Sequence, residues 1–280
     1  MRLALPRLHA YSALPGFKLG LGVTLSYVSL LLLLPLAGLV ARPWEHGADA
    51  FVAAISEPRT LQALRLSFSA AVAAALVNVV FGLALAWALS RYDFPGRRVL
   101  DAMVDLPFAL PTAVAGVALA TLYGPAGPFG AVLNNLFGVK IAYTPAGVFV
   151  ALIAVGLPFI VRSVQPVLED FDAEIEEAAL TLGATPWQRF RRVALPALAP
   201  ALISGFALAF ARGLGEYGSV IFIAGNMPGK SEIAPLLIVI RLEQFDYVGA
   251  ASLGLTLLLL SFVSLTLINL AQAAVERRSR

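Results

Sequence analysis

The sequence predicts an all-α, polytopic membrane protein that crosses the bilayer about six times. Of its 280 residues, 59% are hydrophobic and only 13% are charged, and the mean hydropathy is +0.84. Because soluble domains usually carry about 25% charged residues, a soluble fold of this length would lack the polar side chains needed to cover its surface. A lipid bilayer removes that requirement.

Six segments supply the roughly 20 consecutive, mostly apolar residues that a transmembrane helix needs. The first is too long for a signal peptide and is expected to be retained, while the third and fifth contain prolines and ionisable residues. A shorter run, Ile233–Ile240, is a weaker candidate for a re-entrant segment. The predicted spans are Leu19–Ala41, Leu66–Leu89, Val99–Tyr123, Ala146–Val167, Ala199–Ala224 and Val248–Ala271.

Basic residues gather on one side of these spans, and that side is expected to be the cytoplasm. An even number of spans then places both termini there. The opposite side holds Arg42, Arg59, Arg65, Lys140, Lys230 and Arg241. The richer side holds Arg2, Arg7, Lys18, Arg91, Arg97, Arg98, Arg162, Arg189, Arg191, Arg192, Arg277, Arg278 and Arg280.

Several classes of function are disfavoured by what the chain lacks. The net charge is only +3 and the basic residues are scattered in short clusters, which does not indicate nucleic-acid binding. There are no cysteines, and His9 and His46 are too few for a histidine metal cluster. No Gly-rich phosphate loop ending in Lys-Ser or Lys-Thr is present, so the chain is not expected to hydrolyse a nucleotide.

The longest and most polar internal loop spans 168–200 and is predicted to form two short helices. Helix formers dominate Ala173–Leu182, and Gly183 is suited to end that helix in the left-handed conformation. Thr185 is expected to cap the second helix, with Pro186 at its first position and Gln188 completing a capping box. Pro196 is predicted to interrupt the chain before the fifth span. A solvated amphipathic hairpin on the membrane surface is the alternative.

The same loop carries a long, spaced motif. Glu177-Ala178-Ala179 is followed after three residues by Gly183, and after nine more by Val193, one residue and Leu195-Pro196. This resembles the signature loop of the inner-membrane permease subunits of bacterial ABC importers, and the resemblance extends over most of the chain.

The resemblance implies a type I ABC importer permease fold and a coupling function for the loop. In that family the loop docks on a separate ATP-hydrolysing subunit and transmits its closure to the membrane helices. The coupling residues implied are Glu177, Ala178, Ala179, Gly183, Pro186, Leu195 and Pro196. This chain would bind no cofactor directly; ATP and Mg would be used by the partner ATPase.

Three further stretches resemble permeases for tetrahedral oxyanions: Asp105–Gly116, Ala211–Gly218 and Ile223–Leu237. Together with Leu242–Tyr247, they are most similar to the T-subunit type of sulfate/thiosulfate permease. Molybdate/tungstate or another oxyanion is the alternative substrate. The partners implied are two ATP-binding subunits, a second and different permease subunit, and a periplasmic or lipid-anchored sulfate-binding protein, all in or at a bacterial inner membrane.

A candidate pathway follows from irregular backbone and polar groups at membrane depth. Prolines distort a helix and free backbone groups, which the bilayer tolerates only where protein buries them or a water-filled cavity lies beside them; plain kinks are the alternative. The candidates are Pro107, Pro111, Thr112, Ser204, Arg212, Glu216 and Ser219, whereas Gly116, Gly205, Gly213, Gly215 and Gly218 are expected to allow close helix packing.

Arg212 and Glu216 lie four residues apart and are predicted to share one face of the fifth helix. Charged residues at membrane depth mark functional positions; a structural ion pair holding this helix against a neighbour is the alternative. Because sulfate must be released, hydroxyls and backbone amides suit its pathway better than a cluster of arginines. Asp105 is expected near the cytoplasmic end.

The domain organisation predicted is simple. Residues 1–60 hold the first span and an external loop, 61–272 form the permease domain with the coupling loop at 168–200, and 273–280 form a cytoplasmic tail. An ion-coupled secondary transporter would show inverted repeats and more charges within the spans, and a membrane-embedded enzyme would need a cluster of catalytic side chains. Neither pattern is found in the sequence.

Overall fold

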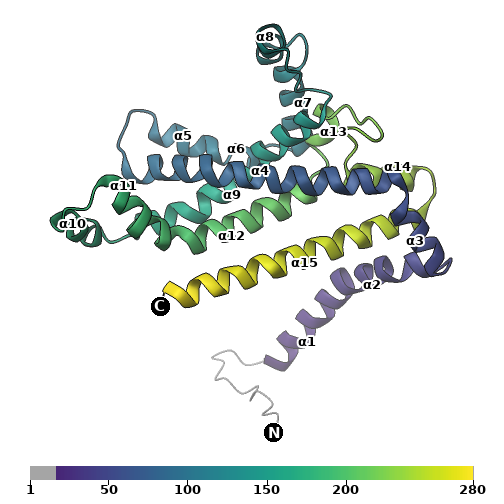
Figure 1. Cartoon of the computed structure of the whole chain (residues 1–280). Coiled ribbons are helices and arrows are strands. Elements are labelled where there is room, and N and C mark those ends of the chain that lie inside the picture. Colours follow the sequence, from purple (N-terminus) through teal and green to yellow (C-terminus); the bar gives the residue numbers. More distant parts are fainter. Residues whose placement is uncertain (1–16, 280) are drawn as a thin grey trace.

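The computed structural model describes residues 17–279, most of which lie in helices (Figure 1). Within this part of the chain, five helices are long and apolar enough to cross a membrane, and one bent helix pair is a sixth candidate. The predicted all-α membrane fold is therefore confirmed. His9 and the basic residues Arg2, Arg7 and Arg280 lie outside the described residues.

The first span is one nearly continuous helix at the edge of the bundle. Its apolar side chains are exposed along its length, as expected for a surface that faces lipid. A π-helical turn ends two residues before Pro35 and widens the helix ahead of the proline ring. The segments are α1 (Phe17–Val28), η1 (Ser29–Leu33), α2 (Leu34–Ala41) and η2 (Arg42–Trp44).

The connection after the first span contains the short helix α3 (Ala48–Ser56). The helix α4 (Pro58–Arg91) begins eight residues before the predicted second span, Leu66–Leu89. Pro58 occupies the first turn of α4, where a missing N–H costs nothing.

The centre of the bundle is α4 packed against α9 (Pro145–Glu169) and α12 (Leu195–Leu214). Small residues line the buried face of α4 and let the neighbouring backbones approach closely. A Cβ on Gly82 would lie only 2.7 Å from the Cγ2 of Ile160. The small residues are Ala63, Ala70, Ala71, Ala74, Ala75, Gly82 and Ala86.

The third span is not the single helix predicted for Val99–Tyr123. Pro107 lies in the first turn of one short helix and Pro111 directly precedes the next, so each proline begins a new helix instead of bending an old one. The helix over Thr112–Tyr123 bends by 42° into a further helix over Pro128–Phe137, beyond the predicted end of this span, and that pair is the sixth candidate span. The helices are α5 (Arg97–Val104), α6 (Leu106–Ala109), α7 (Thr112–Tyr123) and α8 (Pro128–Phe137).

Two predictions for the fifth span are wrong: the interruption at Pro196 and the end of the span at Ala224. Pro196 does not interrupt the chain, because α11 (Pro186–Arg189), the π-helical turn η3 (Phe190–Ala194) and α12 run on as one helix. In η3 the Leu195 N–H donates to the carbonyl of Phe190 five residues back, and this wider turn accommodates the ring. At the other end, the helix stops at Leu214 and not at Ala224.

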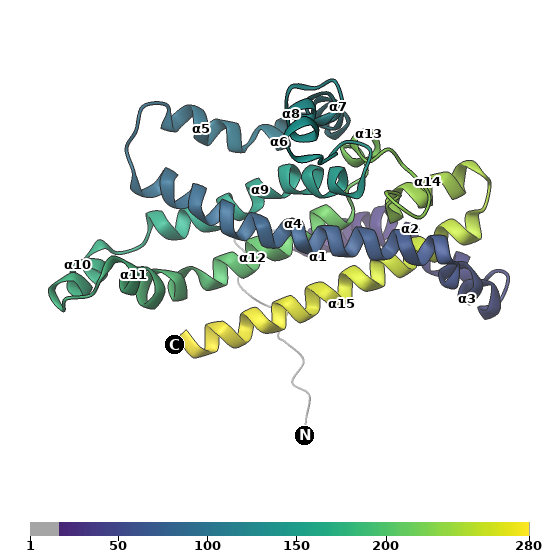
Figure 2. The same cartoon turned by 45° about the horizontal axis from the view of Figure 1, so that its top comes forward.

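The remaining helices are α13 (Val220–Ile223), α14 (Ala234–Glu243) and α15 (Tyr247–Ser279). With 10 residues, α14 is too short to cross the bilayer and fits the predicted re-entrant position. Figure 2 shows α10 (Ala173–Thr181), α11 and the end of α15 at one end of the bundle, with α3 and α14 at the other.

Candidate functional site

The polar loop folds into a helical hairpin, formed by α10, the turn 182–185 and α11. The carboxylate of Asp172 caps α10 by accepting a 3.0 Å hydrogen bond from the N–H of Glu174. Gly183 has φ +79°, the left-handed conformation predicted for it. The N–H of Ala184 then donates to the carbonyl of Ala179 at 3.0 Å. This bond fixes the sharp angle between the two arms.

The second arm begins with the predicted capping box. The Gln188 N–H donates to Thr185 Oγ1 at 3.3 Å, and the Thr185 N–H donates to Gln188 Oε1 at 2.8 Å. Pro186 occupies the first turn. The hairpin is therefore set by signals local to its own sequence, which is why the sequence predicted it.

The surface of the hairpin is apolar where a solvated loop would be polar. Leu182 is 87% exposed and Trp187 66% exposed, and Ile175, Leu180 and Glu177 are exposed beside them. Apolar groups gathered on an exposed element of this kind mark a contact with another protein or with the membrane surface. Docking on a partner and an amphipathic hairpin on the membrane both fit this exposure.

The second part of the site is a pair of facing helix breaks, one before α7 and one after α12. A Cβ on Gly116 would overlap the carbonyl oxygen of Ser219 and lie 2.8 Å from its Cα. A Cβ on Gly218 would overlap the Thr112 hydroxyl. The structure therefore brings Pro111, Thr112 and Ser219 together at a place where two backbones are irregular.

Glu216 lies in the second break, and only 2% of it is exposed. Its Oε1 accepts hydrogen bonds from the Ser219 N–H and Ser219 Oγ, both at 2.9 Å, while its Oε2 pairs with Arg212. Glu216 lies beyond the end of α12, so the two residues do not share a helix face as predicted. The pair also lies within one segment and does not join two helices.

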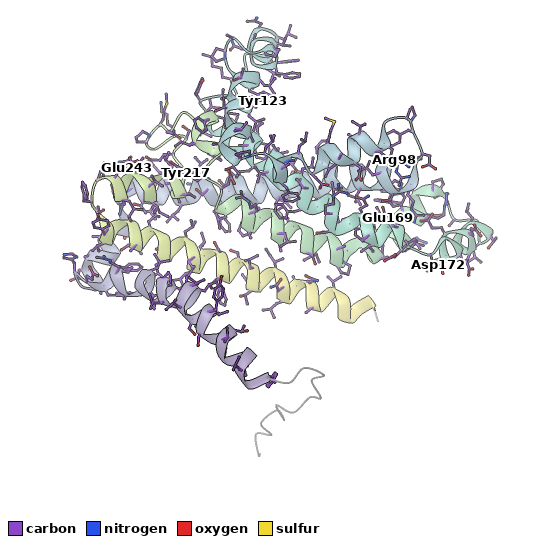
Figure 3. All side chains as sticks on the ribbon, turned by 180° about the vertical axis from the view of Figure 1, so that it is seen from behind. Arg98, Tyr123, Glu169, Asp172, Tyr217 and Glu243 are labelled. Carbon is purple, nitrogen blue, oxygen red and sulfur yellow. The ribbon has the colours of Figure 1, made fainter. Side chains whose placement is uncertain are left out.

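Ser204 is not part of this arrangement. Its hydroxyl donates to the carbonyl of Pro200 at 3.0 Å, and it lies ten residues before the end of α12, about 15 Å along the helix. Figure 3 shows that Tyr217, beside Glu216, lies far from Asp172 at the start of the hairpin. The hairpin and the breaks are thus separate parts of the site.

Sequence reasoning missed an ion-pair cluster at the start of the third span. Arg162 on α9 donates to both carboxylate oxygens of Asp105 at 2.8 and 2.6 Å, and to a carboxylate oxygen of Asp101 at 2.7 Å. The cluster joins α9 to α5 and explains how Asp105 is accommodated. The four-residue spacing of the two acids was the available signal.

The close approach of the two breaks gives a direct test. We expect Gly116→Ala to destabilise the purified protein by about 1–3 kcal/mol, because the added methyl group must displace the backbone at Ser219. Gly213→Ala is the matched control, since its nearest neighbours would lie at ordinary contact distances of 3.7–3.9 Å. Thermal unfolding in detergent measures both. A wild-type transition temperature for Gly116→Ala would show that the breaks do not pack this closely.

Residues 78–280 match the family model described as "Binding-protein-dependent transport system inner membrane component". The chain is 48% identical over 265 residues to the "Sulfate transport system permease protein CysT" of Escherichia coli strain K12, covering 95% of both chains. It is also 48% identical over 250 residues to the protein of the same name from Synechocystis sp., covering 89% of this chain and 87% of the relative.

Solved structures agree on the fold. A bacterial ABC transporter that imports the acidic polysaccharide alginate is similar with a TM-score of 0.76 at 17% identity, covering 92% of this chain and 95% of that one. The inward-facing MetNI methionine ABC transporter is similar with a TM-score of 0.55 at 22% identity, covering 80% and 99%.

Proposed function

The chain belongs to the family of inner-membrane components of binding-protein-dependent transport systems, and we propose that it is the permease subunit of an ATP-driven sulfate/thiosulfate importer. The observation that carries the substrate is the 48% identity to a sulfate permease over 95% of the chain. The exposed, rigid hairpin supports the role of a subunit that is driven by another protein.

The proposed mechanism is alternating access. A binding protein delivers the anion to the outer face, and two ATP-binding subunits close on the inner face. The hairpins of two permease subunits move together, the helices shift the pathway between inward-facing and outward-facing forms, and hydrolysis resets them. The chain itself hydrolyses nothing and supplies half of the pathway.

In this proposal the docking residues are Glu177, Ala178, Ala179, Gly183 and Pro186, with Leu195 and Pro196 joining the hairpin to α12. The small side chains of Ala178 and Ala179 allow a partner to approach closely. The exposed carboxylate of Glu177 is available for a polar contact with the ATPase.

We place the hairpin and both termini in the cytoplasm, because the basic flanks lie on that side. The second permease subunit is proposed to be a different chain. The proposal also divides the chain into an amino-terminal region (1–60), the permease domain (61–272) and a cytoplasmic tail (273–280).

The anion is proposed to pass the facing breaks, where Thr112 and Ser219 supply hydroxyls and the irregular backbone supplies amides. Arg212, already neutralised by Glu216, contributes only a weak positive potential. A divalent anion that must be released within each cycle suits such a site better than a strong cationic clamp.

The test is uptake of radiolabelled sulfate by proteoliposomes that contain the complete transporter, loaded binding protein and internal ATP. We expect uptake to require ATP and to be competed by thiosulfate. ATP-dependent uptake of radiolabelled molybdate by the same proteoliposomes, without uptake of labelled sulfate, would assign the molybdate/tungstate alternative. Uptake that continues without ATP and collapses with the ion gradient would indicate an ion-coupled secondary transporter instead.

A further inference from the structure

We propose that α4 is a rigid strut that carries the movement of the hairpin to α14 at the opposite end of the bundle, with Arg91 and Trp87 as the positioning residues that engage the hairpin. This inference rests on the proposed function, because it assumes that an ATPase moves the hairpin. The helices covalently joined to the hairpin are α9 and α12. The proposal gives the transmission of movement to α4, which meets the hairpin only through side-chain contacts.

The first contact between α4 and the hairpin is an ion pair. The Nη2 of Arg91, in the last turn of α4, donates to the Oε1 of Glu176 on α10 at 2.9 Å. The Arg91 guanidinium also lies 5.7 Å from the ring centre of Trp87 and 5.6 Å from that of Phe171. Both side chains of the pair are 23% exposed, so water screens the pair less than a surface ion pair.

The second contact is aromatic and reaches the other arm. The ring of Trp87 packs edge-on against Phe190, with centroids 5.7 Å apart, and Phe190 stacks on Trp187 of α11 at 5.6 Å. One turn of α4 therefore contacts α10 through Glu176 and the residue directly after α11, Phe190, so a displacement of the hairpin acts on it directly.

The covalent connections of the hairpin are less suited to transmit force. Pro158 and Pro166 interrupt the hydrogen bonding of α9, and Pro200 and the π-helical turn η3 do the same along α11–α12. Such positions are the usual sites of helix bending. By contrast, α4 has 34 residues and its only proline is in its first turn, so it forms a continuous helix of about 51 Å without a proline in its interior.

Two ion pairs join the outer end of α4 to α14. In one pair the α4 side supplies the arginine, and in the other it supplies the glutamate. Arg59 donates twice to the carboxylate of Glu232, at 2.8 and 2.7 Å, just before α14 begins. Arg241, in the last turn of α14, donates to Glu57 and, at 2.7 Å, to Thr60 Oγ1. Both ends of α14 are thus tied to the first turn of α4.

A buried hydrogen bond adds a third tie. The Ala234 N–H, at the start of α14, donates to Ser67 Oγ at 2.8 Å. The chain from α13 to α14 then connects this assembly to the facing breaks, where α13 packs against α7. A displacement of Arg91 is therefore transmitted along α4 to the segment that contains Glu216 and Ser219.

The test uses the complete transporter in proteoliposomes and compares Arg91→Glu, Glu176→Arg and the double exchange. Each single variant is expected to assemble and keep basal ATPase activity but to lower sulfate uptake per ATP hydrolysed by about tenfold, a typical coupling between two sites. The double exchange restores the ion pair and is expected to recover most of the coupling. Arg97→Glu is the matched control, since Arg97 pairs at the same end with Asp93, whose side chain is 96% exposed.

A distance measurement separates a strut from a merely structural contact. The native chain has no cysteines, so spin labels can be placed by Leu242→Cys in α14 and Phe137→Cys in α8, two exposed positions. Trapping with ATP and vanadate is expected to change the label distance in the wild-type background and to leave it fixed in Arg91→Glu.

A distance change that persists in Arg91→Glu, or wild-type coupling in that variant, would overturn the strut alone. Absence of ATP-dependent sulfate uptake by the wild-type complex would overturn the proposed function and the strut with it.

Discussion

Replacing Gly183 with valine is expected to remove most of the sulfate-stimulated ATP hydrolysis of the assembled transporter while the membrane bundle stays folded. The reason is conformational, because φ at this residue is +79°, and not steric, because no atom beyond its chain neighbours lies within 4 Å of an added Cβ. A side chain in this conformation costs about 1–2 kcal/mol, more for a β-branched one. The hairpin relieves that strain by opening its turn, which swings Glu177 and the exposed apolar side chains away from the ATPase.

The measurement is ATPase activity of the complex with and without sulfate-loaded binding protein. Gly96→Val is the matched control, because Gly96 has φ +89° with equally open space around it but lies outside the hairpin. Gly183→Asn is expected to retain activity, since asparagine tolerates the left-handed conformation.

Glu177→Lys tests the same surface without backbone strain. Because Glu177 is exposed, the change leaves the fold intact and reverses the charge offered to the ATPase. Wild-type stimulation in both Gly183→Val and Glu177→Lys would show that the hairpin is not the coupling element.

The hairpin was predictable because its signals are local. Gly183, Thr185 and Gln188 act on residues within one helical turn, and each was found in the predicted conformation. The rule that proline breaks a helix is equally local, yet the interruption predicted at Pro196 is wrong. The rule assumes hydrogen bonds to the fourth residue back, and the π-helical turn before Pro196 bonds to the fifth. No sequence pattern used above predicts a π-helical turn at this position.

The long-range contacts were not predictable in the same way. Arg91 and Glu176 are 85 residues apart, and Arg59 and Glu232 are 173 apart. Charge counting places Arg59 and Arg91 on opposite sides of the membrane, but it cannot say which acid each of them meets, because that depends on the packing of helices remote in sequence. The strut contacts therefore emerge only from the structure.

Arg212→Ala is expected to lower both the stability of the protein and its sulfate uptake, because it leaves the carboxylate of Glu216 buried with only the donors of Ser219. An unmatched buried group costs about 1–3 kcal/mol, and the side chain of Arg212 is 37% exposed, so the loss is below that of a fully buried ion pair. Thermal unfolding and uptake are measured on the same preparation.

The double variant Arg212→Ala/Glu216→Gln distinguishes a pathway residue from a structural pair. It removes both charges, and the amide oxygen of the glutamine can still accept the two hydrogen bonds from Ser219. We expect the stability to return while uptake stays below the wild-type rate, because the anion then passes the breaks without the weak positive potential of the guanidinium. Arg212→Lys keeps the charge and is expected to retain part of the uptake. If uptake in the double variant returned to the wild-type rate together with stability, the Arg212–Glu216 pair would serve the fold alone, and the anion would be guided only by the hydroxyls and backbone amides of the two breaks.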